Sequence, residues 1–315
     1  MEKKLLSIII PAYNEEDLIE KVACSIGEIL KSANISYEIL FVDDGSKDKS
    51  WDIISSVSSK DTYVRGIRFS RNFGKEAAIM AGLSKANGDC CVVIDCDLQH
   101  PPEKIIEMYH LWEQGYEIIE GQKSNRGAEG KLHAFAAKAF YSAISVATGF
   151  DMTNASDFKL LDRKAVNVLI NMREKNVFFR ALSSWIGFKT TSVAFDVQDR
   201  EAGESKWSTR SLVKYAINNI SSFSAAPMQF VTALGAIVLV VSVILGGIAL
   251  FQKFCGQALD GFTTVILIQL FSSSVVMISL GIIGYYIAKI YEEVKDRPQY
   301  IIEDTCGGIA HESSV

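Results

Sequence analysis

The sequence lacks the motifs that mark several common protein classes. Its six cysteines include no C-x-x-C pair and its four histidines form no H-x-x-x-H cluster, which argues against a disulfide scaffold and a zinc site. No G-x-G-x-x-G motif follows the first apolar run and no Walker A motif occurs, so a dinucleotide-dependent oxidoreductase and a P-loop ATPase are disfavoured. Only five prolines occur in 315 residues, which excludes a Pro-rich disordered chain. The net charge of −5 argues against a general nucleic-acid binder, so no nucleic-acid partner is expected.

Charge is also absent from two long stretches late in the sequence. Residues 230–251 and 262–288 contain no Asp, Glu, Lys or Arg. As helices they would reach roughly 33 and 40 Å at ~1.5 Å per residue, enough to cross a hydrocarbon core of ~30 Å, the second with a tilt. Two buried core helices are the alternative, but soluble helices rarely extend this far without a charge. We therefore predict two membrane spans within residues 229–288.

Basic residues indicate how these spans are oriented. The connector 252–261 carries one lysine, whereas three basic residues precede the first span and three follow the second: Lys206, Arg210, Lys214, Lys289, Lys295 and Arg297. The positive-inside rule then places residues 1–228, the tail 289–315 and both termini on the cytosolic side of the plasma membrane. The apolar segment before Pro11 is too short for a signal peptide.

Apolar runs alternate with helix-period segments through the first half of the chain. Strands are predicted over residues 6–10, 39–42, 64–69 and 90–94, with helices over 18–30, 51–57 and 77–85 between them. Strands separated by helices predict a Rossmann-like α/β fold, a mostly parallel sheet flanked by helices. Ligands of such sheets bind beyond the carboxyl ends of the strands.

The segment before the first span has a different pattern. Residues 206–224 mix basic and aromatic side chains with an apolar face, which is typical of a helix lying in the lipid headgroup layer. A helix packed on the sheet is the alternative there, and the same two interpretations are open for residues 131–150. We predict a cytosolic domain, an interfacial amphipathic helix, two membrane spans and a cytosolic tail, over residues 1–205, 206–228, 229–288 (about 230–251 and 262–288) and 289–315.

Two acids one residue apart, Asp95 and Asp97, follow the predicted strand 90–94. Close like charges repel unless a cation lies between them, and Mg²⁺ or Mn²⁺ prefers carboxylate oxygens together with substrate phosphates. A lone D-x-D pattern is usually only a solvated turn, but its position after a buried strand and the extra oxygen donor Gln99 favour a metal site. We predict that Asp95, Asp97 and Gln99 bind Mg²⁺ or Mn²⁺.

The second predicted strand also ends in an acid pair, Asp43 and Asp44. An acid at a strand end can accept hydrogen bonds from a ribose or a base edge. The alternative is a capping aspartate with Gly45 making the turn, and the two acids can divide these roles. After the first strand, Tyr13 can stack on a base, whereas Asn14 or Glu15 can simply start a helix.

Six segments, in order, resemble the motifs of one enzyme family: SIIIPAYNEE, FVDDGSKDKS, SRNFGKEAA, DCDLQHPPE, SDFKLLDR and REAGESKWS. The first four are similar to motifs of the inverting family-2 glycosyltransferases with a GT-A fold. The last two, followed by two apolar runs, are similar to the polyprenyl-phosphate glycosyltransferases, which include bactoprenol glucosyltransferases and dolichol-phosphate mannose synthases. The resemblance covers essentially the whole chain, and it implies a GT-A domain followed by two membrane helices.

The resemblance also implies a set of site residues. The family often has an arginine near position 123, where this chain has Lys123 and, three residues on, Arg126, so which cation serves stays open. The resemblance implies Pro11, Tyr13, Glu15, Val42 and Asp44 for the nucleoside, Asp95, Asp97 and Gln99 for the metal and diphosphate, and Arg200 and Lys206 for phosphates. With our own additions, the residues predicted to bind the nucleotide sugar also include Asp95, Cys96, Lys123 and Arg126, and the residues predicted for catalysis are Asp97, Asp157, Arg200 and Lys206.

The chemistry of these residues suits transfer of a sugar from a nucleoside diphosphate to a lipid phosphate. A divalent ion on Asp97 and nearby cations would stabilise the charge that develops on the diphosphate leaving group. A phosphate monoester has a second pKa near ~6, so the nucleophile needs little help from a general base. We therefore favour a positioning role for Asp157, with a general base as the alternative. One displacement would invert the anomeric carbon and give a β-linked product from an α-linked donor.

Several features of the reaction stay open. UDP-glucose and undecaprenyl phosphate are the expected donor and acceptor, for cell-wall or lipopolysaccharide O-antigen decoration, but UDP-N-acetylglucosamine, a modified UDP-sugar or GDP-mannose would use the same motifs. A processive polysaccharide synthase is disfavoured because its Q-x-x-R-W signature is absent. A membrane scaffold that binds nucleotide sugar and a lipid-linked-sugar translocase are the alternatives outside this enzyme class. Homo-oligomers through the membrane helices are compatible with the sequence.

Overall fold

The computed structural model of the chain describes residues 4–123, 156–172, 174, 178–196, 226–255 and 261–308. The chain divides into two compact units, residues 1–212 with 298–315 and residues 213–297. The first is an α/β domain built on one sheet, and the second contains two long apolar helices. Residues 131–150 and residues 206–225 of the predicted interfacial helix lie outside the described residues, whereas residues 226–228 belong to the helix that begins at Ala226.

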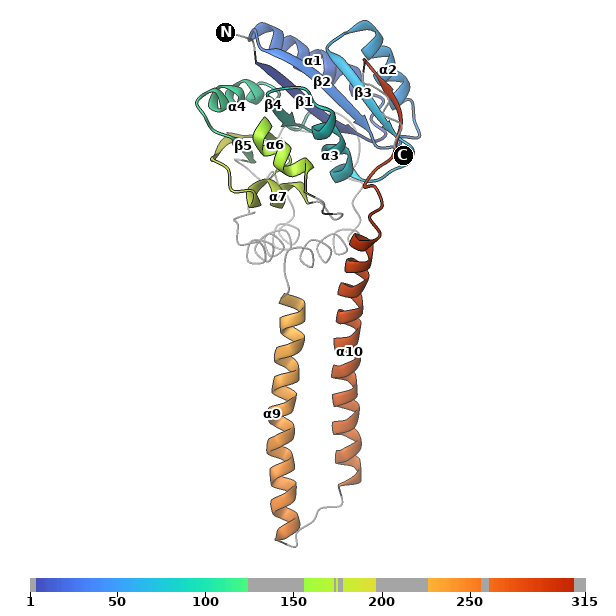
Figure 1. Cartoon of the computed structure of the whole chain (residues 1–315), viewed down its shortest axis with the longest axis vertical. Helices are drawn as coiled ribbons and strands as arrows, with labels where there is room; N and C mark the ends of the chain where they lie inside the picture. Colours follow the sequence, from blue (N-terminus) through green and yellow to red (C-terminus); the bar gives the residue numbers. More distant parts are fainter. Residues whose placement is uncertain are drawn as a thin grey trace. The chain divides into compact units, whose positions relative to one another are not determined.

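An eight-stranded, mostly parallel sheet forms the centre of the first unit (Figure 1). Its order is β7-β5-β6-β4-β1-β2-β3-β8. β4, β1, β2 and β3 are parallel neighbours and β5 is parallel to β7, whereas β6 is antiparallel to β4 and β5, and β8 is antiparallel to β3. The strands are β1 (Leu5–Ala12), β2 (Ser36–Asp43), β3 (Val64–Phe69), β4 (Cys90–Val93), β5 (Ile118–Lys123), β6 (Lys159–Asp162), β7 (Thr190–Phe195) and β8 (Ile302–Cys306).

Helices cover both faces of this sheet. Ile8 and Ile10 of β1 belong to the core that α1, α2 and α4 complete, whereas Ile9 faces α3. A Cβ on Gly82 of α3 would lie 2.2 Å from Ile9 Cγ2, so α3 packs directly on the strand. Because both faces are covered, β1 and β2 are nearly continuous apolar runs. The helices are α1 (Ile19–Ser32), α2 (Ser50–Lys60), α3 (Lys75–Lys85), α4 (Lys104–Glu113), α6 (Arg163–Ile170) and α7 (Phe179–Trp185).

The predicted α/β fold is confirmed, and the predicted elements differ from the observed ones mainly at their ends. All four predicted strands and all three predicted helices of the first half are present. α3 begins two residues before its predicted start, directly after Gly74, whose φ of 101° is in the region that favours glycine. No strand was predicted beyond residue 94, whereas the described residues contain four more.

The last of these strands follows the two apolar helices in the chain. β8 pairs with the otherwise open edge of β3, with Ile67 opposite Thr305. The backbone N–H of Ser70 donates to the carbonyl of Ile301 at 3.1 Å, and Tyr300 stacks on Phe69 with ring centroids 5.1 Å apart. A segment predicted only as a tail therefore supplies one edge of the sheet in the first unit.

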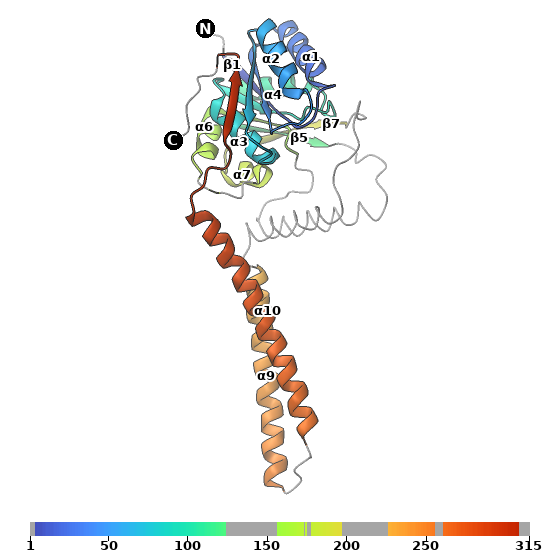
Figure 2. The same cartoon turned by 90° about the vertical axis from the view of Figure 1, so that its right-hand side faces the viewer.

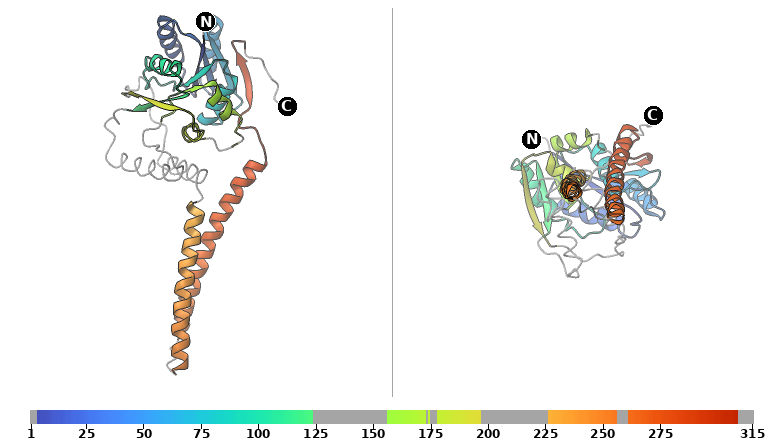
Figure 3. Two further views of the ribbon diagram at one scale, coloured as in Figure 1. Left: turned by 60° about the vertical axis from the view of Figure 1, so that its left-hand side comes forward. Right: turned by 90° about the horizontal axis from the view of Figure 1, so that it is seen from below.

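The second unit consists of α9 (Ala226–Phe254) and α10 (Phe262–Val294), which run antiparallel and side by side (Figure 2, Figure 3). By length and composition both could cross a membrane, over Val231–Ile248 and Ile268–Val294. Only 0% and 6% of these windows are buried inside the structure, so neither is a core helix of the described chain. Such large exposed apolar surfaces are unfavourable in water, and we treat both helices as candidate membrane spans.

Candidate active site

The predicted polar clusters lie at one edge of the sheet. β4, β1 and β2 are parallel neighbours, so their carboxyl ends lie side by side. Pro11 pairs with Val42 across β1 and β2, and the backbone N–H of Ile94 donates to the carbonyl of Ile9 at 3.0 Å. The residues at or directly after these three strand ends include Pro11, Tyr13, Glu15, Val42, Asp44, Asp95, Cys96, Asp97 and Gln99.

Side-chain hydrogen bonds join the loops that follow β1 and β2. The backbone N–H of Asn14 donates to Ser46 Oγ at 2.9 Å, and the N–H of Glu15 donates to Ser50 Oγ at 2.9 Å. Asn14 returns the contact, because its Oδ1 accepts from the N–H of Lys47 at 2.9 Å. The hydrogen bonds between these loops therefore fix the backbone next to the half-buried Tyr13. A side chain that stacks on a base needs such a fixed position.

Asp43 and Asp44 divide two structural roles between them. Asp43 is fully buried, and its Oδ1 accepts from the N–H of Ser46 at 3.1 Å, so Asp43 shapes the turn after β2. Asp44 accepts from the N–H of Phe73 at 2.7 Å and from the N–H of Gly74 at 2.9 Å. It thus holds the backbone that leads into α3. A carboxylate offers about four lone-pair sites, so Asp44 retains acceptor capacity for a nucleoside. Burial raises the pKa of Asp44 to about 6.

We expect Asp44→Asn to lower stability most in acid. The carboxamide keeps one acceptor oxygen and turns its NH₂ group towards a backbone donor, which costs about 1–2 kcal/mol. Since the folded-state pKa of Asp44, about 6, exceeds the unfolded value of about 4, the folded chain holds an extra proton between these pH values. Its contribution to stability falls as the pH rises through this window. Thermal unfolding in detergent should therefore show a larger loss of stability for the variant at pH 4.5 than at pH 7. An equal loss at both pH values would contradict a raised pKa for Asp44 in the folded chain.

A group that could hold a metal ion follows β4. Ligand atoms of Asp95, Asp97 and His100 lie within 4.8 Å of one another. His100 is 5% exposed, and its ring lies 5.2 Å from the ring centroids of both Phe158 and Phe195. Burial lowers the pKa of His100, which favours the neutral imidazole that binds metals, and its Nδ1 has no hydrogen-bond partner among the described residues. Two carboxylates and one such nitrogen fit a divalent cation.

Gln99 and Cys96, the two other predicted site residues of this loop, have different surroundings. The backbone N–H of Gln99 donates to Asp97 Oδ1 at 3.1 Å, which closes a tight turn, and ligation by the Gln99 side chain stays a prediction. Cys96 is 4% exposed and packs in the hydrophobic core, where burial raises the pKa of its thiol. Binding of a nucleotide sugar by Cys96 also stays a prediction.

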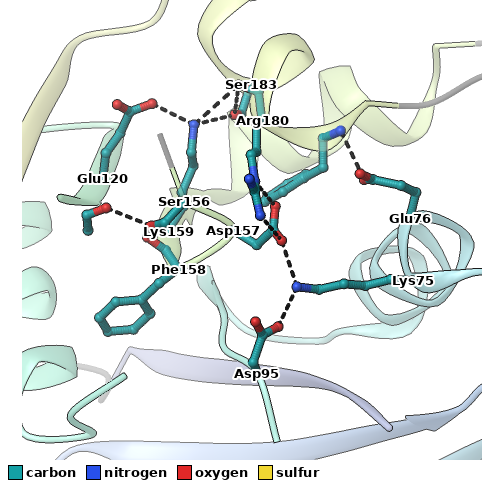
Figure 4. A network of polar contacts seen from close by, with 12 residues as sticks. Lys75, Glu76, Asp95, Glu120, Ser156, Asp157, Phe158, Lys159, Arg180 and Ser183 are labelled. Carbon is teal, nitrogen blue, oxygen red and sulfur yellow. Dashed lines mark hydrogen bonds and ion pairs between the residues drawn. The ribbon is translucent and has the colours of Figure 1, made fainter. Parts of the chain in front are cut away.

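Asp157 lies at the centre of a network of charged side chains (Figure 4). Lys75 Nζ lies 2.6 Å from Asp157 Oδ2 and 2.6 Å from Asp95 Oδ1. Arg180 binds Asp157 with two hydrogen bonds, Nε to Oδ1 at 2.7 Å and Nη2 to Oδ2 at 2.8 Å. Burial would raise the pKa of Asp157, but the charges of Arg180 and Lys75 outweigh it and hold the pKa well below its usual range. A carboxylate bound to two cations is a weak base, so the geometry favours a positioning role.

A second buried ion pair anchors the helix that carries Arg180. Lys159 is 0% exposed, and its Nζ donates to Glu120 Oε1 at 2.6 Å and to Ser183 Oγ at 2.7 Å (Figure 4). Burial lowers the pKa of Lys159, and Glu120 opposes that shift. On the other side of α7, Glu76 accepts from the N–H of Phe179 at 3.0 Å. These contacts fix α7 against β5, β6 and α3.

Of the remaining predicted cations, the structure describes Lys123. Lys123 ends β5, which is parallel to β4 because β6 is antiparallel to both, so Lys123 lies at the same edge of the sheet as Asp95. Arg126, Arg200 and Lys206 lie outside the described residues. Three residues of the site, Lys75, His100 and Arg180, were not predicted from the sequence. Lys75 follows the end of β3 and His100 follows Gln99, so the strand-end rule could have found both, whereas no sequence pattern indicates Arg180.

The chain is similar in sequence to known proteins over most of its length. Residues 7–169 match the family profile described as glycosyl transferase family 2. The chain is 39% identical over 303 residues to the uncharacterized glycosyltransferase YkcC of Bacillus subtilis, covering 96% of this chain and 94% of that protein. It is 34% identical to the prophage bactoprenol glucosyl transferase homolog of Escherichia coli, covering 95% and 98%. A solved glucosyl-3-phosphoglycerate synthase from Mycobacterium tuberculosis is similar at 21% identity and a TM-score of 0.49, over 70% of this chain and 79% of that one.

Proposed function

Because the chain belongs to glycosyl transferase family 2, we propose that it transfers a sugar from a nucleoside diphosphate to a polyprenyl phosphate at a membrane surface. That it is a glycosyltransferase using a nucleotide sugar follows from the family. The finer proposal adds UDP-glucose as donor, undecaprenyl phosphate as acceptor and a β-linked product. Relatives whose names give a bactoprenol glucosyl transferase, from Escherichia coli and Shigella phage SfII, support this donor and acceptor.

One observation in the structure carries this proposal. The acids suited to a metal and the cations suited to phosphates form one connected cluster, in which Lys75 binds both Asp95 and Asp157. A transferase that joins a diphosphate donor to a phosphate acceptor must bring two anions together. Such a site needs positive charge on both the donor side and the acceptor side.

On the donor side, Asp95, Asp97 and His100 or Gln99 would hold Mg²⁺ or Mn²⁺, which supplies charge stabilisation for the leaving diphosphate when bound. Tyr13 and Glu15 are held by the joined loops after β1 and β2, where they would bind the nucleoside together with Pro11, Val42 and Asp44. Lys123, Arg126, Arg200 and Lys206 are the further cations proposed for the phosphates.

On the acceptor side, the nucleophile needs orientation more than deprotonation. A phosphate monoester is mostly dianionic at neutral pH, because its second pKa is about 6. Asp157 is ionised and engaged by Lys75 and Arg180, so it orients these two cations and takes no proton from the acceptor. One displacement at the anomeric carbon then inverts it.

The chain's topology supports catalysis at one membrane face. β8 follows α9 and α10 in sequence but pairs with β3, so the segments that flank the two apolar helices belong to one domain. That domain lies on one side of any bilayer the helices cross. The basic residues flanking the spans favour the cytosolic side, with residues 206–228 as an interfacial helix that brings Arg200 and Lys206 to the headgroups.

A donor panel tests the proposal. The full-length protein, in nanodiscs with undecaprenyl phosphate and Mn²⁺ or Mg²⁺, is offered UDP-glucose, UDP-N-acetylglucosamine and GDP-mannose, and lipid products are identified by mass spectrometry. We expect a hexosyl lipid phosphate from UDP-glucose, and no product with undecaprenol, which lacks the phosphate. Product from another donor alone would replace the donor assignment. Tight binding of UDP-glucose with no product from any donor would favour a scaffold.

A further inference from the structure

Lys75 occupies an unusual position between the two halves of the site. It is the first residue of α3, and its ammonium lies 2.6 Å from a carboxylate oxygen of Asp95 and 2.6 Å from one of Asp157. The side chain of Lys75 is 40% exposed, whereas that of Asp157 is 5% exposed and that of Asp95 25%. The ammonium therefore bridges the two acids, while part of the Lys75 side chain remains in contact with solvent (Figure 4).

We propose that Lys75 and the divalent cation compete for Asp95, and that Lys75, once displaced, stays bound to Asp157 and binds the acceptor phosphate. This inference rests on the proposed function for its second half only. Competition for Asp95 concerns metal binding and requires no sugar transfer.

The competition follows from charge and distance. Asp95 belongs to the group whose ligand atoms lie within 4.8 Å of one another, so a metal held there would contact the carboxylate that Lys75 now binds. A divalent ion lies about 2.1 Å from its ligand oxygens, which would leave the ion and the ammonium only a few ångströms apart. Like charges at this separation repel strongly in a partly buried site. Occupation of Asp95 by the metal therefore weakens the contact between Asp95 and Lys75.

Asp157 determines where Lys75 goes. Lys75 Nζ also contacts Asp157, and this contact keeps the ammonium at the site after its contact with Asp95 is lost. Asp157 then serves two cations, Lys75 and Arg180, and the part of the Lys75 charge that Asp95 compensated becomes available to an incoming anion. Both cations are partly exposed, with Arg180 at 24%, while their shared acid is not. Exposed cations in front of a buried acid are suited to bind a phosphate dianion.

Metal binding to the substrate-free, full-length protein tests the first half. Mn²⁺ is titrated and followed by electron paramagnetic resonance for the wild type, Lys75→Met, Asp157→Asn and the double variant. We expect Lys75→Met to bind Mn²⁺ about tenfold more tightly, because it removes a close positive charge. Asp157→Asn should bind Mn²⁺ more weakly, since Lys75 then pairs with Asp95 alone, and this loss should vanish in the double variant.

Opposite shifts distinguish competition from a structural role. If Lys75 only supports the fold, Lys75→Met and Asp157→Asn will both weaken Mn²⁺ binding, and that result overturns the proposal, as does an unchanged affinity in Lys75→Met. Lys164→Met is the matched control, because Lys164 is exposed and its ammonium lies 4.0 Å from Glu117. Lys75→Gln is the second variant should Lys75→Met fail to fold, with the same expected direction.

Kinetics test the second half. Lys75→Met should raise the KM for undecaprenyl phosphate and lower kcat while leaving the KM for the donor close to that of the wild type, and Lys75→Arg should recover part of the loss. Tighter Mn²⁺ binding with an unchanged acceptor KM would overturn phosphate binding by Lys75. Absence of transfer in the wild type would instead refute the proposed function, and the Mn²⁺ comparison would still decide the competition.

Discussion

Asp97→Asn is expected to reduce sugar transfer by about 10³-fold or more, the loss typical of removing a main source of transition-state charge stabilisation. Asp97 is one of the three side chains whose ligand atoms come together after β4, and asparagine offers a neutral oxygen in place of a charged one. Chelation of the wild type should abolish transfer to a similar extent, and added Mn²⁺ should restore the wild type but not the variant. Product formation and Mn²⁺ titration together measure this.

The matched control for this variant is Asp52→Asn, since Asp52 is exposed on α2 and is not one of the residues assigned to the site. It should keep wild-type transfer and Mn²⁺ affinity. Full turnover by Asp97→Asn in the presence of a chelator would remove the metal from the proposed reaction. The residues after β4 would then be a hydrogen-bonded turn, as the contact from the Gln99 N–H to Asp97 already allows.

Glu120→Leu is expected to be the most destabilising of the substitutions considered. It leaves the ammonium of Lys159 fully buried with no anionic partner, and breaking a buried ion pair from one side costs about 3–5 kcal/mol. For a domain of this size the loss corresponds to a fall of about 10 °C in the unfolding midpoint. The double variant Glu120→Leu, Lys159→Met should regain most of it, because apolar side chains can replace the pair without leaving a buried charge.

The control for this effect is the exposed pair Lys104–Glu107, whose atoms lie 2.8 Å apart within α4. Glu107→Leu should change the midpoint by no more than a degree or two, because exposed pairs contribute about 0–1 kcal/mol. A double variant no more stable than Glu120→Leu alone would show that the hydrogen bonds from Lys159 to α7, and not charge compensation, dominate. The midpoints of thermal unfolding in detergent rank these variants by stability.

The parts of the fold that the sequence predicts are those in which local pattern and tertiary environment agree. β1 and β2 are buried on both faces, so each is an unbroken apolar run, and α1 buries one stripe at helical spacing. Because parallel strands end at one edge, the acids after β2 and β4 could be placed in one site without coordinates.

The missed strands lack such a pattern. β6 has four residues, including Lys159 and Asp162, and it enters the sheet antiparallel, which brings Asp157 to the catalytic edge from its amino end. Sequence spacing does not reveal that reversal. The partners of Asp157 were missed for the same reason, since Lys75 is 82 residues away and meets it only through packing. Contacts between segments far apart in the sequence could therefore not be predicted from the pattern of residues.

The position of β8 sets the order in which the domain is completed during synthesis. The ribosome makes β1 to β7 first, then α9 and α10, and only then the strand that covers β3. Until β8 has been made, β3 presents open backbone groups, the kind of edge that recruits other chains. A chain that ends before β8 would keep that edge open and would be more prone to pair with other chains.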